Sequence, residues 1–265
     1  MIPVYPDATH TPYSSSFAMK KDEIYRILNE AYFSENAHER DSHPSFQDLV
    51  RNAKVFLDVG ASLGQYTRLA SQAMQGAEII AVEADPVRFE ELQRNCAVWA
   101  QQSGNRIRAI HAAAAPESGS VRFQTTCSNM SGGLIRHGGD RPNGDSTWTE
   151  VEVPALSLQA LCADQTPDII KMDIEGAELH VLRAASSFLC DARPRLVVEL
   201  HVFPEVGGLE NYTRTVSLMR GLGFRNLPFY GKSLFVPKTS LSLAESLRYQ
   251  LRSWSWRLRR RVLAG

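Results

Sequence analysis

A buried strand that runs directly into a glycine-bracketed turn and a helix is the feature that most constrains this chain. Residues 55–59 form an apolar run that only Asp58 interrupts, near its end. Gly60 and Gly64 bracket the turn, and the apolar spacing after it is helical. Continuous apolar runs are typical of strands buried on both faces of a parallel sheet. The pattern therefore predicts an α/β fold that includes strand 55–59 and helix 64–75.

The same turn predicts a ligand site. Glycines let a ligand approach the backbone closely, and the first N–H groups of a helix point outward from its start. The spacing is Asp-x-Gly-x-x-x-Gly, which differs from the Gly-x-Gly-x-x-Gly of dinucleotide-binding folds and from a phosphate loop. Because Asp58 would repel a pyrophosphate, the turn suits a cationic nucleoside that carries an amine and a sulfonium. A purely structural turn is the alternative interpretation.

A second acid follows the next predicted strand. Strand 78–83 ends in Glu83, about twenty residues after the turn, where an acid can accept hydrogen bonds from ribose hydroxyls. Asp85 and Pro86 then fit the N-cap and the first position of a helix. Strands that alternate with helices indicate a parallel sheet with right-handed crossovers. The further elements expected on this pattern are helix 86–102 and strand 106–111.

Polar residues also end two later strands. Strand 169–173 ends in Asp173, at the edge where open α/β sheets bind ligands. A helix is expected to carry Glu175 and Glu178 in its first turn and to end at Phe188, and for Glu178 a favourable interaction with the helix dipole is the simpler interpretation. In a strand over 195–201, Glu199 and His201 would share a face. Burying such groups costs several kcal/mol unless they are paired, so we expect them beside Asp173.

These pieces together resemble the FkbM-type methyltransferases. The resemblance is carried by Asp-Ile-Ile-Lys-Met-Asp-Ile-Glu-Gly-Ala-Glu at 168–178, by Leu-Val-Val-Glu-Leu-His at 196–201, and by the order of the earlier anchors. It covers roughly residues 52–236. It implies an α/β class I methyltransferase fold, Rossmann-like, with a mostly parallel seven-stranded sheet, helices on both faces and a late antiparallel strand at 233–236. It also implies S-adenosylmethionine-dependent O-methylation of a hydroxyl on a sugar, a glycan or a polyketide-like product.

The resemblance and the anchors assign roles to particular residues. The residues expected to bind S-adenosylmethionine are Asp58, Gly60, Ala61, Ser62, Gly64, Tyr66, Glu83, Ala84, Ala113 and Asp173. The expected catalytic residues are His201, as the base because imidazole titrates near neutral pH, then Asp173 and Glu199. Alternatively, a divalent ion acidifies the hydroxyl, held by oxygen ligands and one imidazole. Its candidate ligands are Asp173, Glu175, Glu199 and His201.

The chain outside the resemblance divides into two flanking parts. We expect residues 1–51 to form an N-terminal arm with cap helices, 52–238 the S-adenosylmethionine-binding domain, and 239–265 a basic amphipathic helix. Within the domain, the glycine-rich stretch 127–150 is expected to be a lid on the substrate side. Residues 241–262 combine a leucine and tryptophan stripe with many arginines, which suits either an anionic membrane or packing on a partner.

Composition bears on the expected partners of the protein and on its cellular compartment. Lys+Arg and Asp+Glu number 29 each, so no nucleic-acid partner is expected. The four scattered cysteines contain no Cys-x-x-Cys pair and are expected to be buried thiols in a reducing cytoplasm. With no signal peptide and no membrane-spanning run, we expect a cytoplasmic enzyme, with the tail offering peripheral contact at the inner membrane surface. A non-catalytic nucleoside-binding scaffold that docks through its tail and a nucleotide-dependent oxidoreductase are the alternatives.

Overall fold

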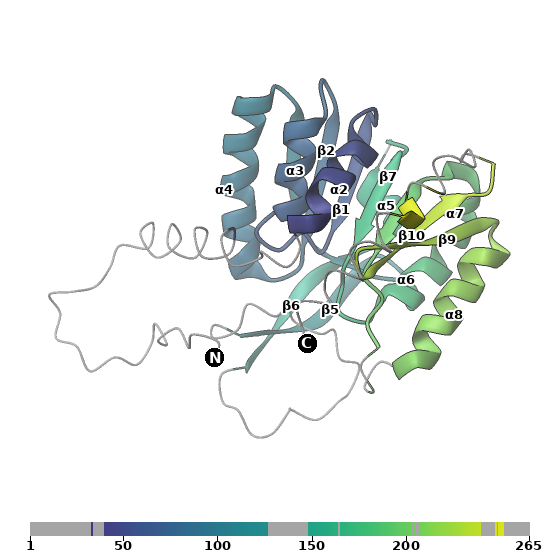
Figure 1. The fold of residues 1–265 in the computed structure, drawn as a ribbon. Coiled ribbons are helices and arrows are strands. Elements are labelled where there is room, and N and C mark those ends of the chain that lie inside the picture. The colour runs from purple at the N-terminus through teal and green to yellow at the C-terminus, as the bar shows by residue number, and fades with distance from the viewer. Residues whose placement is uncertain are drawn as a thin grey trace, which may run out of the picture.

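Figure 1 shows the fold in a computed structural model, which describes residues 33, 40–126, 148–163, 165–202, 204, 207–239, 247 and 249–251. Several expected features lie outside these residues: the irregular N-terminal arm and its first helix, most of the predicted lid, and nearly all of the basic C-terminal helix. Among the described helices, none has the length and apolar character that crossing a membrane requires.

A seven-stranded sheet forms the centre of the molecule, in the order β3-β2-β1-β7-β8-β10-β9. Its strands are β1 (Val55–Val59), β2 (Glu78–Glu83), β3 (Arg106–His111), β7 (Ile169–Met172), β8 (Arg195–Val198), β9 (Phe224–Phe229) and β10 (Lys232–Pro237). Every neighbouring pair is parallel except those of β10, which runs antiparallel to β8 and β9. The predicted class I methyltransferase sheet, with its late antiparallel strand, is therefore confirmed.

Helices cover both faces of this sheet, as expected (Figure 1). They are α2 (His43–Val50), α3 (Gln65–Ala73), α4 (Pro86–Ser103), α5 (Leu158–Cys162), α6 (Glu178–Ala184), α7 (Ser186–Ala192) and α8 (Gly208–Gly221). Alternate residues of β1 belong to different apolar clusters: Phe56 packs with side chains of α2 and α3, and Leu57 with those of α5, α6 and α8. Both are fully buried, which explains why β1 reads as a continuous apolar run.

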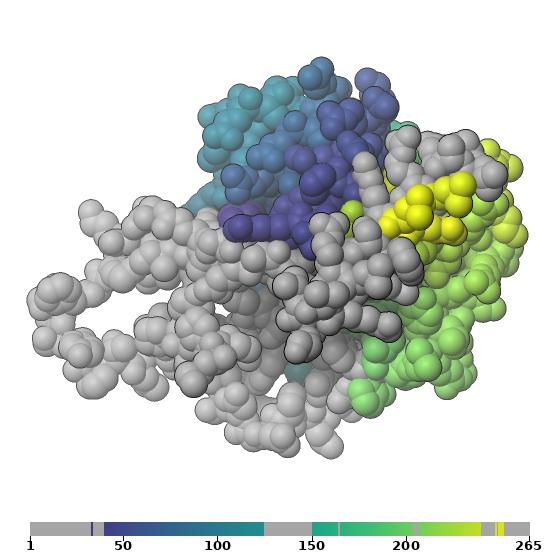
Figure 2. All heavy atoms as spheres, viewed as in Figure 1, coloured from purple at the N-terminus to yellow at the C-terminus, as the bar shows by residue number. Residues whose placement is uncertain are grey.

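Strand β1 marks the point where the strand order reverses. From β1 the chain moves outward to β2 and β3, and it then returns to the other side of β1 as β7 and β8. Figure 2 shows the result on the surface: the earlier elements, in purple and blue, and the later elements, in green and yellow, occupy opposite sides of the body. The loops after β1 and β7 therefore diverge at the carboxyl edge, which is where open α/β sheets bind ligands.

A small second sheet projects from the same body. It contains β4 (Ala113–Ala114), β6 (Trp148–Leu156) and β5 (Gly119–Thr126), in that order. Strands β5 and β6 form an antiparallel hairpin, so the second strand begins within the stretch predicted as the lid. Its inner face carries Phe123 and Val153, which pack against Ala113.

Two predicted elements are wrong in extent: the helix that follows strand 169–173 and the strand over residues 195–201. The helix expected from Glu175 to Phe188 begins only at Glu178 and gives way to α7 after Ala184. Glu175 has φ +53° and Gly176 has φ +106°, and such left-handed residues cannot continue an α-helix. Strand β8 ends at Val198, which is paired with the last residue of β7, Met172, so residues 199–201 follow the end of the strand.

The predicted helix N-cap is confirmed, but one of the cysteines that were predicted to be buried is exposed. Asp85 caps α4 by accepting hydrogen bonds from the backbone N–H groups of Val87 and Arg88, as predicted. Ser157 caps α5 in the same way. Cys96 and Cys162 are buried free thiols, but Cys190 is exposed, because it lies on the outer side of α7, whose only buried residue is Leu189.

Candidate functional site

The glycine turn after β1 is tied to the end of β2. The backbone N–H groups of Gly60 and Ala61 both donate to the carbonyl of Val82, at 3.0 and 2.9 Å. Gly60 has φ +72°, and Gly64 has φ +96° at the N-cap of α3. Both values lie in the region that glycine adopts without strain. The turn therefore has the backbone conformation that the glycine spacing predicts.

Glu83 anchors the middle of this turn. Its Oε2 accepts a 2.7 Å hydrogen bond from the N–H of Ser62, and its Oε1 accepts one of 2.8 Å from the N–H of Asp85. Its side chain is 6% exposed, and burial raises the pKa of the carboxyl while the Arg88 charge and the two N–H donors oppose that rise. A carboxylate oxygen has a second lone pair, so Glu83 can still accept hydrogen bonds from a ligand.

Asp58 lies beneath the turn, with no exposed surface. Its Oδ2 accepts a 2.7 Å hydrogen bond from Thr67 Oγ1 on α3. Burial raises the pKa of its carboxyl, opposed mainly by the charge of Lys171. In this position Asp58 joins β1 to α3 and supports the turn from within.

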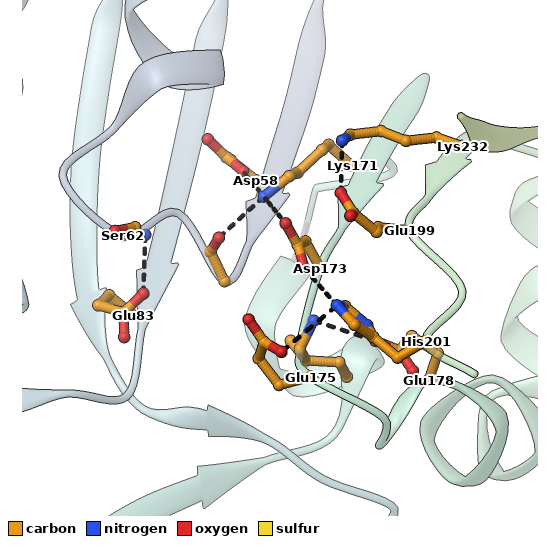
Figure 3. Close-up of polar contacts among 12 residues, drawn as sticks. Asp58, Ser62, Glu83, Lys171, Asp173, Glu175, Glu178, Glu199, His201 and Lys232 are labelled. Carbon is orange, nitrogen blue, oxygen red and sulfur yellow. Dashed lines mark hydrogen bonds and ion pairs between the residues drawn. The ribbon is translucent and has the colours of Figure 1, made fainter. Parts of the chain in front are cut away.

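Lys171, from the middle of β7, connects Asp58 to the other half of the site. Its Nζ donates a 2.8 Å hydrogen bond to the carbonyl of Gly60. The same atom lies 3.6 Å from Asp58 Oδ1 and 3.8 Å from Asp173 Oδ2 (Figure 3). With 4% of its surface exposed, Lys171 is a buried cation between two carboxylates. It therefore links the turn after β1 to the end of β7.

Three carboxylates surround the imidazole of His201 (Figure 3). Nδ1 lies 3.0 Å from Glu178 Oε1, and Nε2 lies 3.4 Å from Glu175 Oε2 and 3.7 Å from Asp173 Oδ1. One possible ligand atom each from Asp173, Glu175 and His201 lies within 4.8 Å of the others. We call Asp173, Glu175 and His201 the carboxylate–imidazole cluster.

Glu178 fixes the orientation of this cluster. Its side chain is fully buried, and Oε1 accepts hydrogen bonds from the N–H groups of Ile174 and Gly176, at 3.2 and 3.1 Å. The same oxygen is the partner of His201 Nδ1. Glu178 therefore holds both the turn that carries Glu175 and the imidazole that faces it.

The charges of the cluster shift the pKa values of its members. Burial alone would lower the pKa of His201, but the hydrogen bond and charge of Glu178, with the charges of Glu175 and Asp173, raise it to about 9. Burial raises the pKa of Glu175, and the nearby His201 opposes that rise. The acids and the imidazole therefore stabilise one another electrostatically.

Glu199 does not join the cluster. Its carboxylate pairs with Lys232 Nζ from β10, and Figure 3 places this pair above Asp173, away from the imidazole. Strand alternation therefore does not put Glu199 and His201 side by side, since both follow the end of β8. The structure brings together three of the four candidate metal ligands.

The remaining predicted cofactor residues lie along the same edge. Tyr66 is on α3, 4% exposed, with the Lys171 ammonium 5.3 Å from its ring centroid. Ala84 follows Glu83 and packs in the apolar cluster of Ala113, under the small sheet.

Sequence reasoning missed the roles of Lys171, Glu178 and Lys232. The lysine within the apolar run of β7 could have indicated a buried polar site, because a buried ammonium requires charged or hydrogen-bonding partners. For Glu178 only the interaction with the helix dipole was considered; it does lie in the first turn of α6, but its full burial and its bond to His201 were missed. Lys232 carries no signal of its own, because its partner is set by the pairing of β10 with β8.

Comparison with known proteins gives one family. Residues 58–226 match the model of the methyltransferase FkbM domain. The methyltransferase sdnD of Sordaria araneosa is 26% identical over 212 residues, covering 70% of this chain and 78% of that protein.

Two solved structures are among the matches. The methyltransferase FkbM of Methylobacillus flagellatus is 17% identical, with a TM-score of 0.47, over 69% of this chain and 43% of that one. This chain therefore spans less than half of that solved chain. A putative caffeoyl-CoA O-methyltransferase of Staphylococcus aureus is 11% identical, with a TM-score of 0.48, over 83% and 93% of the two chains.

Proposed function

Because the chain belongs to the FkbM methyltransferase family, we propose that it transfers the methyl group of S-adenosylmethionine to a hydroxyl oxygen of a sugar, a glycan or a polyketide-like product. The observation that carries the proposal is the meeting of two features at the β1/β7 edge. The glycine turn with Glu83 suits a nucleoside, and the carboxylate–imidazole cluster beside it suits a group that loses a proton.

The cofactor would lie across the carboxyl edge, with its ribose hydroxyls at Glu83. Ala84 and Ala113 would flank the adenine, and the methionine portion would extend over Gly60 toward Asp173. Asp58 and Lys171 would act from below, by fixing the turn and Asp173. This orientation would place the sulfonium methyl in front of the cluster.

The reaction is an in-line displacement. A lone pair of the hydroxyl oxygen forms the new C–O bond while the C–S bond breaks, and its electrons remain on sulfur to give S-adenosylhomocysteine. The hydroxyl proton goes to Asp173 Oδ1 or to the neutral form of His201 Nε2, which lie 3.7 Å apart; because the pKa of His201 is raised to about 9, its neutral form becomes more abundant as the pH rises toward that value. An acid-rich cluster of this kind is not needed for an amine acceptor, and this favours oxygen.

Cofactor binding tests the first half of the proposal. We expect S-adenosylmethionine to bind the purified protein in calorimetric titration, and Glu83→Gln to weaken that binding by about 10- to 100-fold, because a hydrogen bond to a charged group is lost. Glu152→Gln, an exposed carboxylate of β6, is the matched control and should bind as the wild type. Absence of binding in folded protein, or equal affinity of Glu83→Gln, would refute this orientation.

Transfer itself is tested with isotopically labelled S-adenosylmethionine and a panel of sugars, glycans and polyketide-like alcohols. The expected product carries one additional methyl group, on oxygen, located by mass spectrometry and NMR. A product methylated on nitrogen or carbon would overturn the O-methyltransferase assignment while leaving the cofactor site intact.

A further inference from the structure

We propose that the carboxylate–imidazole cluster binds a divalent cation of the Mn²⁺ or Mg²⁺ type, with Asp173, Glu175 and His201 as its protein ligands. The cation site follows from the side-chain geometry alone. Its catalytic use, given below, rests on the proposed function.

The spacing of the donor atoms carries the first part of the argument. His201 Nε2 lies 3.4 Å from Glu175 Oε2 and 3.7 Å from Asp173 Oδ1. These distances are longer than ordinary N–H···O hydrogen bonds, so the three groups converge as ion pairs. Two neighbouring ligands of an octahedral cation with bonds of about 2.1 Å are about 3 Å apart. Both distances to Nε2 would therefore have to shorten by less than about 1 Å for the carboxylates and the imidazole to bind one cation.

The second part comes from Glu178. Its Oε1 is 3.0 Å from His201 Nδ1, which orients the ring so that Nε2 faces the carboxylates of Asp173 and Glu175; a cation bound there would take the place of the Nε2 proton. A buried carboxylate behind a histidine is the usual arrangement that orients a metal ligand. Glu178 cannot turn away, because the backbone N–H groups of Ile174 and Gly176 hold the same oxygen.

Charge supplies the third part. Around one imidazole lie the carboxylates of Asp173, Glu175 and Glu178, and Oε2 of Glu178 is buried with no hydrogen-bond partner in the described part of the chain. The ammonium of Lys171 lies 3.8 Å from Asp173 Oδ2 and is shared with the buried Asp58. A divalent cation at the convergence point would compensate this excess of negative charge. Two carboxylate oxygens and one imidazole favour Mn²⁺ or Mg²⁺ over a thiol-preferring metal.

Glu199 is not included among the proposed cation ligands. Glu199 is the closest further carboxylate in the sequence, but Lys232 pairs with it. A three-ligand site leaves cation positions open for oxygens of the acceptor. A hydroxyl bound there has a lower pKa and releases its proton to solvent, so the cation would replace the Asp173–His201 pair in activating the nucleophile.

The test uses Mn²⁺ itself. Binding to the whole chain is followed by the loss of the free-ion signal in electron paramagnetic resonance, without cofactor or acceptor. We expect one bound Mn²⁺ per chain, at least about 10-fold weaker binding in Asp173→Asn, Glu175→Gln and His201→Gln, and a similar loss in Glu178→Gln. Glu199→Gln should bind Mn²⁺ like the wild type. Failure of folded protein to bind Mn²⁺, or equal binding by Glu175→Gln, would overturn the proposal.

Calorimetric titration of S-adenosylmethionine in the presence of EDTA separates this proposal from the proposed function. Cofactor binding without Mn²⁺ binding would refute the cation site and leave methyl transfer in place. Mn²⁺ binding without cofactor binding would support the cation site and refute the proposed function.

Discussion

Replacing Lys171 with methionine is expected to lower the free energy of unfolding by about 3–5 kcal/mol, the usual cost of removing one partner of a buried ion pair. Methionine has a similar length and packs in apolar surroundings, so lost volume contributes little. The cost arises because Asp58, with no exposed surface, loses the cation 3.6 Å from its Oδ1. Urea denaturation followed by circular dichroism measures the change.

The double variant Lys171→Met/Asp58→Asn identifies the source of this loss. It removes the buried negative charge while an amide oxygen can still accept from Thr67, so we expect a large part of the stability to return. If the double variant is less stable than Lys171→Met, Asp58 is not the group that Lys171 stabilises. A single variant within about 1 kcal/mol of the wild type would likewise contradict the argument.

The stability of the Lys171→Met variant is expected to depend on pH, because Asp58 loses the nearby charge of Lys171. Burial raises the pKa of Asp58 above the ordinary value of 3.8, and the charge of Lys171 opposes that rise, so the variant raises this pKa further. A carboxyl whose pKa is higher in the folded state binds its proton more tightly there, so stability improves as the pH falls through the folded pKa. The stability difference from the wild type should therefore narrow as the pH is lowered from neutral toward the ordinary carboxyl pKa of 3.8, measured by urea denaturation at each pH.

The sequence-based predictions were most accurate where one local rule decides the outcome. The apolar runs of β1 and β2 predicted the strand bounds found in the structure, because strands buried on both faces leave no ambiguity of period; the bounds of β3, a partly exposed edge strand, were also predicted. Glycine spacing likewise predicted the turn, since Gly60 and Gly64 adopt positive φ. Asp85 marked the start of α4 through its side chain.

Predictions failed where a partner element determines the structure. Strand β8 was expected to continue beyond Val198, but its pairing with β7 ends at the Met172–Val198 pair. Glu199 then pairs with Lys232, a contact between residues far apart in the sequence. The burial of Glu178 has the same origin, because its hydrogen-bond partners are two turn N–H groups and an imidazole from another element.

Gly60→Ala is expected to weaken S-adenosylmethionine binding by about 100-fold or more and to destabilise the protein, because a Cβ at this position would overlap the backbone of β7. An ideal Cβ on Gly60 would lie 1.8 Å from the carbonyl oxygen of Asp173. Neither strand can move aside, since Asp173 N–H donates to Val59 O and Gly60 N–H donates to Val82 O. The turn must therefore shift, together with Ser62, whose N–H meets Glu83.

Substitutions at two other glycines distinguish the effect of steric overlap at Gly60 from the cost of placing alanine in a left-handed backbone conformation. Gly76 has φ +58° but no atom within 4 Å of its ideal Cβ, so Gly76→Ala should lose only about 1 kcal/mol of stability and no cofactor affinity. Gly119 also has open space and no such φ, so Gly119→Ala should change neither quantity. Calorimetry and thermal denaturation of the three variants give the comparison. If Gly60→Ala resembles Gly76→Ala in both measurements, contact between the turn and β7 does not position the cofactor, and the turn owes its glycine to backbone conformation alone.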